Sequence, residues 1–158
     1  MINATRAAGC LGAFALVAAA VLAAPNEADA VTLTTSAVLC NPWLNEQSNF
    51  FEYGINGVRV KPGGVGGTLT CAVPRSPLAS PQGFYVDGAN SPGWCTSITL
   101  SAYNYDGTFQ DSEALQSCST TYDLYTTLDP ITSWSYVSAL VTLPPAGQGT
   151  FYGVVSMQ

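Results

Sequence analysis

The chain has 158 residues, of which 47% are hydrophobic and only 9% are charged, with a formal net charge of −6 and no histidine. So few cationic side chains cannot form the basic surface that binds a phosphate backbone, which argues against nucleic acid as a partner. Without histidine, Ser-His-Asp and Cys-His catalytic sites are excluded as well.

Residues 1–30 have the features of a secretory signal peptide. Arg6 supplies a positive charge, residues 11–24 are apolar, and Ala28-Asp29-Ala30 has the small residues of a cleavage site. We therefore expect one mature domain at 31–158, secreted or in the periplasm. We also expect no membrane insertion after cleavage, because no second apolar run of comparable length follows.

Short segments of alternating apolar and polar residues, separated by turn residues, predict strands in the first half of this domain. A strand is expected at 31–40, a loop at 41–49, and a hairpin of 51–55 and 58–61 around Asn56-Gly57, which is a strong turn signal. The clearest strand is 68–73. Its residues Leu69, Cys71 and Val73 share the inward side, and Pro74 ends it because proline cannot donate to a ladder.

The second half of the domain shows the same pattern. Strands are expected at 83–87, 94–105, 108–118, 122–128, 134–143 and 151–157, with a loop at 88–93 and a hairpin at Asp106-Gly107. Residues 134–143 are apolar on both faces, as in a central strand. Threonine, tyrosine and valine are frequent and helical periodicity is absent, so the sequence predicts an all-β protein. The expected fold is a disulfide-bonded antiparallel β-sandwich of about eight to ten short strands.

Four cysteines follow the signal segment, and an even number in an exported chain indicates two disulfides. Pairing of Cys40 with Cys71 and of Cys95 with Cys118 is favoured, because it joins neighbouring strands without threading a loop. A zinc site is the alternative, but the cysteine spacing and the lack of histidine argue against it. Cys10 could instead carry a lipid anchor, although a lipidated cysteine should follow the apolar run rather than precede it.

Three features of the chain resemble a loosely defined group of uncharacterised exported bacterial proteins. They are Cys71-Ala72-Val73-Pro74-Arg75 at a strand end, the strand from Cys95 to Asp106-Gly107, and Leu143-Pro144 before a final hydrophobic strand. In that group a Cys-Pro-Val-x-Arg-like stretch ends an early strand, whereas Ala72 replaces the proline here. The last strands here also lack a cysteine. The resemblance implies export and a disulfide-bonded sandwich, and it implies no catalytic residues.

Acidic residues offer the remaining catalytic or metal chemistry. Asp106, Asp111 and Glu113 are close in sequence, and paired carboxylates could support glycoside hydrolysis or weak calcium binding. The trio lacks the regular spacing of a calcium loop, and Asp111 and Glu113 are expected on one side of the return strand as a solvated surface. We therefore predict no catalytic residues, no cofactor and no dedicated metal site.

Aromatic residues offer a binding surface, since exposed rings can stack on sugars or anchor a partner protein. The predicted ligand-binding residues are Trp43, Tyr53, Tyr103 and Tyr105. Trp94 and Trp134 are instead expected to fill the core, because they extend apolar strand faces.

The sequence thus predicts a secreted, non-enzymatic β-sandwich that acts by surface contact, with carbohydrate or a cell-surface protein as its partner. Two alternatives remain open. One is a carboxylate-dependent glycoside hydrolase, and the other is a structural or assembly subunit that pairs through sheet edges. The sequence leaves the oligomeric state undetermined.

Overall fold

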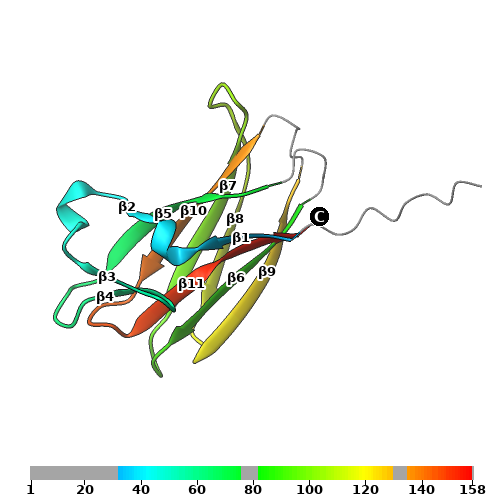
Figure 1. Cartoon of the computed structure of the whole chain (residues 1–158). Coiled ribbons are helices and arrows are strands. Elements are labelled where there is room, and N and C mark those ends of the chain that lie inside the picture. Colours follow the sequence, from blue (N-terminus) through cyan, green and yellow to red (C-terminus); the bar gives the residue numbers. More distant parts are fainter. Residues whose placement is uncertain (1–31, 76–81, 130–134, 158) are drawn as a thin grey trace, which may run out of the picture.

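The computed structural model describes residues 32–75, 82–129 and 135–157, which form two antiparallel β-sheets packed face to face (Figure 1). These three ranges contain strands and short 3₁₀ turns but no α-helix. None of their helical segments is long and apolar enough to cross a membrane. The predicted signal peptide lies outside the described residues. The predicted disulfide-bonded β-sandwich is confirmed, with eleven strands in the described part of the chain rather than eight to ten.

One sheet, which we call sheet B, has the strand order β2-β5-β10-β7-β8. Its strands are β2 (Asn41–Pro42), β5 (Gly67–Val73), β10 (Tyr136–Leu143), β7 (Thr96–Tyr103) and β8 (Phe109–Ser117). In β10, Val137, Ala139 and Val141 are buried, while the residues between them face outward. The period-2 alternation of the sequence therefore sends every second side chain of this central strand into the core.

The opposite sheet, sheet A, has the order β3-β4-β11-β6-β9, with β1 also paired to β11. Its strands are β1 (Leu33–Ser36), β3 (Phe51–Gly54), β4 (Gly57–Val60), β6 (Gln82–Asn90), β9 (Thr121–Leu128) and β11 (Gly149–Met157). The register between β11 and β6 shifts between Phe151 and Gly153, so Tyr152 is an extra residue. Such a bulge redirects a side chain locally.

The core lies between the inward faces of the two sheets. Its largest fully buried side chains come from both sheets and include Phe84, Phe151, Leu69, Ile98, Leu100, Leu128 and Leu143. Burying each such side chain contributes about 1.5–3 kcal/mol relative to leaving it exposed. The two sheets therefore depend on one common core.

Two disulfides join Cys40 to Cys71 and Cys95 to Cys118, the pairs favoured by the sequence. Cys40 directly precedes the edge strand β2 and Cys71 lies in β5, so the first bond fastens one edge of sheet B. Cys95 precedes β7 and Cys118 follows the other edge strand, β8. Both edges of sheet B are thus held covalently, with the second bond at the sheet margin as expected.

The structure corrects three predicted strand boundaries. The first strand ends at Ser36 rather than near Cys40, because residues 37–39 form a 3₁₀ turn. Asn41 and Pro42, expected in a loop, pair with Thr70 and Leu69 as β2. Residues 88–90 were also expected in a loop, but they continue β6 and pair with β11 and β9. Pairing partners far along the chain decide the second and third of these boundaries, so local composition could not reveal them.

Both predicted hairpins are present. The β3–β4 turn contains Ile55 and Asn56 between the paired residues Gly54 and Gly57, one position before the expected Asn56-Gly57 pair. Gly57 has a φ of 136°, and a Cβ atom there would lie 2.3 Å from the carbonyl oxygen of Phe151. Only glycine therefore lets this hairpin approach β11. The β7–β8 hairpin turns around residues 105–107 as predicted.

Candidate functional site

Sheet B presents short hydroxyl side chains on its outer surface, which we call the hydroxyl face. Its hydroxyl residues are Thr68 and Thr70 of β5, Ser138 and Thr142 of β10, Ser97, Thr99 and Ser101 of β7, and Ser112 of β8. All of them are exposed or partly exposed, whereas their neighbours along β5, β10 and β7 are mostly buried. Serine and threonine alternate with apolar residues in these strands, so the sequence itself creates the face.

The strand register aligns these side chains in rows across the sheet. In one row, Thr68 lies opposite Thr142, and Thr142 lies opposite Ser97. The hydroxyl groups of Thr68 and Thr142 are hydrogen-bonded at 3.1 Å. The amide of Gln116 in β8 donates to the Ser97 hydroxyl at 3.3 Å. Each such hydroxyl keeps further hydrogen-bonding capacity for a ligand, because a hydroxyl group can donate once and accept twice.

Trp94 borders the hydroxyl face at one end, beside a hollow of about 410 Å³. Thr68, Thr142 and Ser97 line the same hollow, together with Gln47 from the segment after β2. Trp94 is 41% exposed. The prediction that Trp94 fills the core is therefore wrong: β7 begins only at Thr96, so the inward parity of the strand does not extend back to Trp94. Trp134 lies outside the described residues.

The segment that carries Trp94 is held by several independent contacts. The Trp94 amide donates to the carbonyl of Ser91 at 3.1 Å, and the next residue forms the Cys95–Cys118 disulfide. The Thr96 hydroxyl donates to the buried Asn90 side chain at 2.7 Å. Trp94 is consequently presented by a fixed turn rather than by a freely moving loop.

Asn90 connects this turn to both sheets. Its amide nitrogen donates to the carbonyls of Ser117 at 3.0 Å and of Ser119 at 3.2 Å, while its oxygen accepts from Thr96. Tyr122 lies nearby, and burial raises the pKa of its hydroxyl to about 12 despite an opposing hydrogen bond with Thr96. Buried polar groups of this kind fix geometry when all of their hydrogen bonds are made.

An aromatic cluster borders the other end of the hydroxyl face. Tyr103 stacks on Tyr136 with ring centroids 5.5 Å apart, and it meets Phe109 edge-on at 5.9 Å. Tyr136 also borders a second hollow of about 400 Å³, which contains Thr70 and Ser138. Stacked and edge-on rings at these separations are mutually favourable. The cluster therefore offers an ordered aromatic surface.

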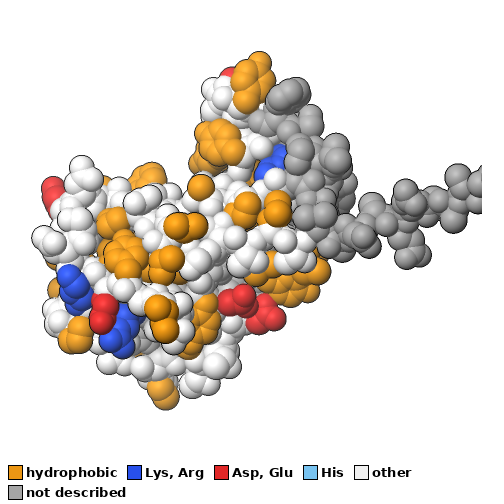
Figure 2. Space-filling view, viewed as in Figure 1, with side chains coloured by type: hydrophobic (Ala, Val, Ile, Leu, Met, Phe, Trp, Pro, Cys, Tyr) orange, Lys and Arg blue, Asp and Glu red, His pale blue; other side chains and the backbone are white. Residues whose placement is uncertain are grey.

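The predicted ligand-binding residues are not all brought together. Tyr103 belongs to the aromatic cluster, and Tyr105 is 75% exposed in the turn beyond it. Figure 2 shows hydrophobic side chains beside polar ones at this protruding hairpin end. Trp43 is 58% exposed, and its amide donates to the carbonyl of Thr68, so its backbone lies at the β2 edge of the same sheet. Tyr53 lies in β3 of sheet A, away from this face.

The acidic trio does not form a metal site. Within residues 32–75, 82–129 and 135–157, no three or more His, Cys, Asp or Glu side chains gather in a group that could hold a metal ion. Hydrogen bonds with Thr108 lower the pKa of Asp106 in the hairpin turn. Asp111 accepts from the amide of Asp129 at 2.7 Å. Asp111 and Glu113 do share one side of β8, but their partners Ala102 and Leu100 face the core, so this side is opposite to the hydroxyl face.

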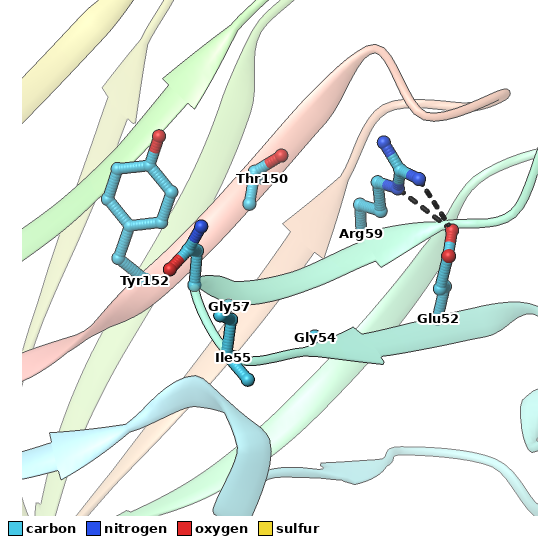
Figure 3. A pocket seen from close by; sticks show the side chains of 8 residues that line it. Glu52, Gly54, Ile55, Gly57, Arg59, Thr150 and Tyr152 are labelled. Carbon is cyan, nitrogen blue, oxygen red and sulfur yellow. Dashed lines mark hydrogen bonds and ion pairs between the residues drawn. The ribbon is translucent and has the colours of Figure 1, made fainter.

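Sheet A carries a different outer surface. A pocket of about 310 Å³ lies over β3, β4 and the bulged part of β11. Figure 3 shows Tyr152, Thr150 and Arg59 across this pocket, with Arg59 paired to Glu52. The Arg59–Glu52 ion pair has an N–O distance of 2.8 Å, and both side chains are about half exposed.

Two carboxylates occupy a second part of the outer surface of sheet A, over β6 and β9, where Figure 2 shows acidic side chains in red. Asp87 lies directly opposite Asp123 in the register. Partial burial raises the pKa of Asp87, and the charge of Asp123 and a hydrogen bond with it raise this pKa further. Next to them, Tyr85 and Tyr125 have ring centroids 4.8 Å apart.

The prediction from sequence missed Trp94, Tyr136 and Phe109 as surface residues. A signal for Tyr136 was present, since it continues the outward series of Ser138 and Thr142 at a spacing of two. Residues 134–143 were interpreted as apolar on both faces, which hid this series. Phe109 gave no comparable signal, because a register shift between Ala102 and Tyr103 brings it opposite Tyr103.

No family model matches the sequence, and no curated protein sequence matches it. Solved structures do share the fold. The CBM36-1 domain of a multidomain xylanase from the hindgut metagenome of Trinervitermes trinervoides is similar, with a TM-score of 0.51 and 10% identity over 81% of this chain and 97% of that domain. The xylan-binding module CBM15 has a TM-score of 0.52 and 15% identity over 80% of this chain and 95% of the module. At these identities the likeness concerns the fold: the chain has the β-sandwich architecture of two carbohydrate-binding modules.

Proposed function

We propose that the protein binds carbohydrate on the hydroxyl face of sheet B and does not cleave it. The observation that carries this proposal is the combination of ordered hydroxyl rows with exposed aromatic groups at both ends. Aromatic rings can stack on the apolar faces of sugar rings, and short hydroxyl side chains can exchange hydrogen bonds with sugar hydroxyls. A few well-placed polar groups among apolar contacts are typical of ligand sites.

The rigidity of sheet B also supports binding. The Cys40–Cys71 and Cys95–Cys118 disulfides hold the two edges of this sheet, and the Asn90 hydrogen bonds hold the turn of Trp94. A surface that is already ordered loses less conformational entropy when a ligand binds. The disulfides also fit the oxidising compartment of an exported protein, as does the predicted signal peptide.

The two similar structures support the same class of ligand. One belongs to a xylanase and the other is described as xylan-binding. This chain covers nearly the whole of each module, so the shared architecture is that of the complete binding module. Xylan and other plant polysaccharides are therefore the first ligands to test.

Glycoside hydrolysis is the competing function, and the placement of carboxylates favours binding instead. Asp111 and Glu113, the sequence candidates for a catalytic pair, lie on the side of β8 opposite to the hydroxyl face. Asp87 and Asp123 lie on sheet A. A glycosidase needs two carboxyl groups on either side of one scissile bond, with a separation of about 5–9.5 Å. The carboxylates of Asp87 and Asp123 are instead close enough to interact directly.

The test is binding of the purified protein to insoluble xylan and cellulose by sedimentation, with calorimetry on soluble fragments. Trp94→Ala should weaken binding about 30-fold or more, because an aromatic side chain that anchors a ligand contributes about 2 kcal/mol or more. Tyr125→Ala on sheet A is the matched control and should bind like the unmodified protein. Release of reducing ends should not exceed that of a heat-denatured sample. Absence of binding to any polysaccharide, or full binding by Trp94→Ala, would contradict the proposal.

A further inference from the structure

We infer that the bound glycan lies along strands β10 and β7, from Trp94 to Tyr136, and is a neutral linear chain of several sugar units. This inference rests on the proposed function and adds the direction, length and charge class of the ligand.

The direction follows from the positions of the aromatic groups. Trp94 lies beside Ser97 and Thr142, at the start of β7 and the end of β10. Tyr136 and Tyr103 lie at the opposite ends of the same two antiparallel strands. Residues 136 and 142 are six positions apart, or ~20 Å at the rise of an extended strand. A glycan that crosses the strands would contact either Trp94 or the aromatic cluster at Tyr103 and Tyr136. A glycan that lies along the strands contacts Trp94 and the cluster together.

The surface between the two ends is compatible with a chain lying on it. The hollow at Trp94 and the hollow at Tyr136 both open on the hydroxyl face, and they share the strands β5 and β10. Between them, Leu140 of β10 lies opposite Thr70 on one side and Thr99 on the other. This row therefore has an apolar centre with a hydroxyl group on each flank, and the outward residues of β10 between Tyr136 and Thr142 are Ser138 and Leu140. Sugar rings present apolar faces and polar edges, which match this arrangement.

The charge class follows from the chemistry of the groups along this path. The central strand contributes Tyr136, Ser138, Leu140 and Thr142, and β7 contributes further hydroxyl groups. Hydroxyl, aromatic and aliphatic groups can satisfy neutral sugar hydroxyls, whereas sulfate or carboxylate groups are best matched by cationic donors. Arg59 lines the pocket on sheet A and is already paired with Glu52, and no Lys or Arg is among the described residues that line the two hollows of the hydroxyl face. A neutral glycan is accordingly the expected ligand.

The experiment is a calorimetric length series with xylan-derived and cellulose-derived oligosaccharides, from disaccharide to octasaccharide. With the unmodified protein, affinity should increase with length until the ligand reaches both ends, and then level off. Tyr136→Ala should weaken octasaccharide binding about tenfold or more, but disaccharide binding at Trp94 less than about twofold. Tyr136→Phe, which keeps the ring, should behave like the unmodified protein.

A second variant places an obstacle halfway along the path. Leu140→Arg, checked for an unchanged thermal unfolding midpoint, should lower octasaccharide affinity to that of the disaccharide. Because the interaction involves uncharged groups, affinity should also be insensitive to added salt. The inference is overturned if affinity is already maximal for the disaccharide, or if neither Trp94→Ala nor Tyr136→Ala shows an effect that depends on ligand length. Absence of binding by all oligosaccharides and by intact xylan and cellulose would instead overturn the proposed function itself.

Discussion

The outer faces of sheets A and B follow the same alternation but carry different side chains. Sheet B presents rows of serine and threonine between aromatic ends, whereas sheet A presents the Arg59–Glu52 ion pair and the opposed Asp87 and Asp123. Both disulfides also fasten sheet B, one at each edge. In this sandwich the shared inward face provides stability, while the outward residues can differ freely because they take no part in the core.

Both outer faces depend on the common core, so a substitution in the core should have the largest effect on stability. Phe84→Ala should destabilise the protein by about 3–5 kcal/mol, because Phe84 is fully buried and its removal leaves a cavity. Denaturation with urea measures this change. Tyr85→Ala, the outward neighbour in the same strand, is the control and should cost about 0.5–1.5 kcal/mol through loss of the Tyr125 contact. Equal losses in the two variants would contradict the assigned orientation of β6.

Both disulfides belong to sheet B, so their removal should affect the two sheets differently. Replacing both cysteines of either pair by alanine should cost about 3–4 kcal/mol in the chain-entropy description of disulfide stabilisation. Only the Cys95–Cys118 replacement should also weaken polysaccharide binding at a temperature where the variant remains folded, because this bond holds the turn of Trp94. Denaturation and sedimentation measured on both double variants would test this distinction. Equal binding by the two would show that the disulfide does not position Trp94.

Asn90 tests the same support without a covalent change. Asn90→Ala should destabilise the fold by about 1–3 kcal/mol, since it leaves buried partners such as the Thr96 hydroxyl and the Ser117 carbonyl without their hydrogen bonds. Polysaccharide affinity should fall as well, because the turn of Trp94 loosens. Asn56→Ala in the exposed β3–β4 turn is the control, with little change in either measurement. Unchanged stability in Asn90→Ala would indicate that water replaces these bonds.

The smallest effect on stability is expected from Asp87 and Asp123 of sheet A, and this effect should depend on pH. Folding raises the pKa of Asp87 above its usual 3.8. The Asp87 carboxyl group therefore binds a proton more tightly in the folded protein than in the unfolded chain. Stability from this group is therefore lost as the pH rises above about 3.8 and through the folded pKa. Asp123→Asn should reduce this loss and stabilise the protein by about 0.2–1 kcal/mol at neutral pH, because like charges directly opposite on a sheet repel.

Unfolding midpoints of Asp123→Asn and the unmodified protein, measured from pH 3 to pH 7, test this prediction. The two curves should converge at low pH and separate as the pH rises. Polysaccharide binding should be unchanged, since both carboxylates are on the other sheet from the hydroxyl face. A difference between the two unfolding midpoints that grows toward low pH would contradict the prediction.

Local pattern was sufficient for much of the fold. The strand around Leu69, Cys71 and Val73 was predicted with its buried side, and so was the β7–β8 hairpin. Local pattern failed for β2, which is only two residues long and exists because β5 pairs with it. It failed for Trp94 as well, since this residue ends the turn that precedes β7 and lies outside the strand whose parity was extended to it.

The sequence by itself determined the all-β class and the alternation of hydroxyl and apolar residues, because these depend on neighbours in the chain. It favoured the cysteine pairing that the structure contains but left the other connectivities open. Only the tertiary structure decided that the hydroxyl residues of β5, β10 and β7 lie in common rows. It also decided that Trp94 and Tyr136 mark opposite ends of one surface. Register between strands distant in sequence sets both arrangements, and it is chosen by packing of the whole core against the second sheet.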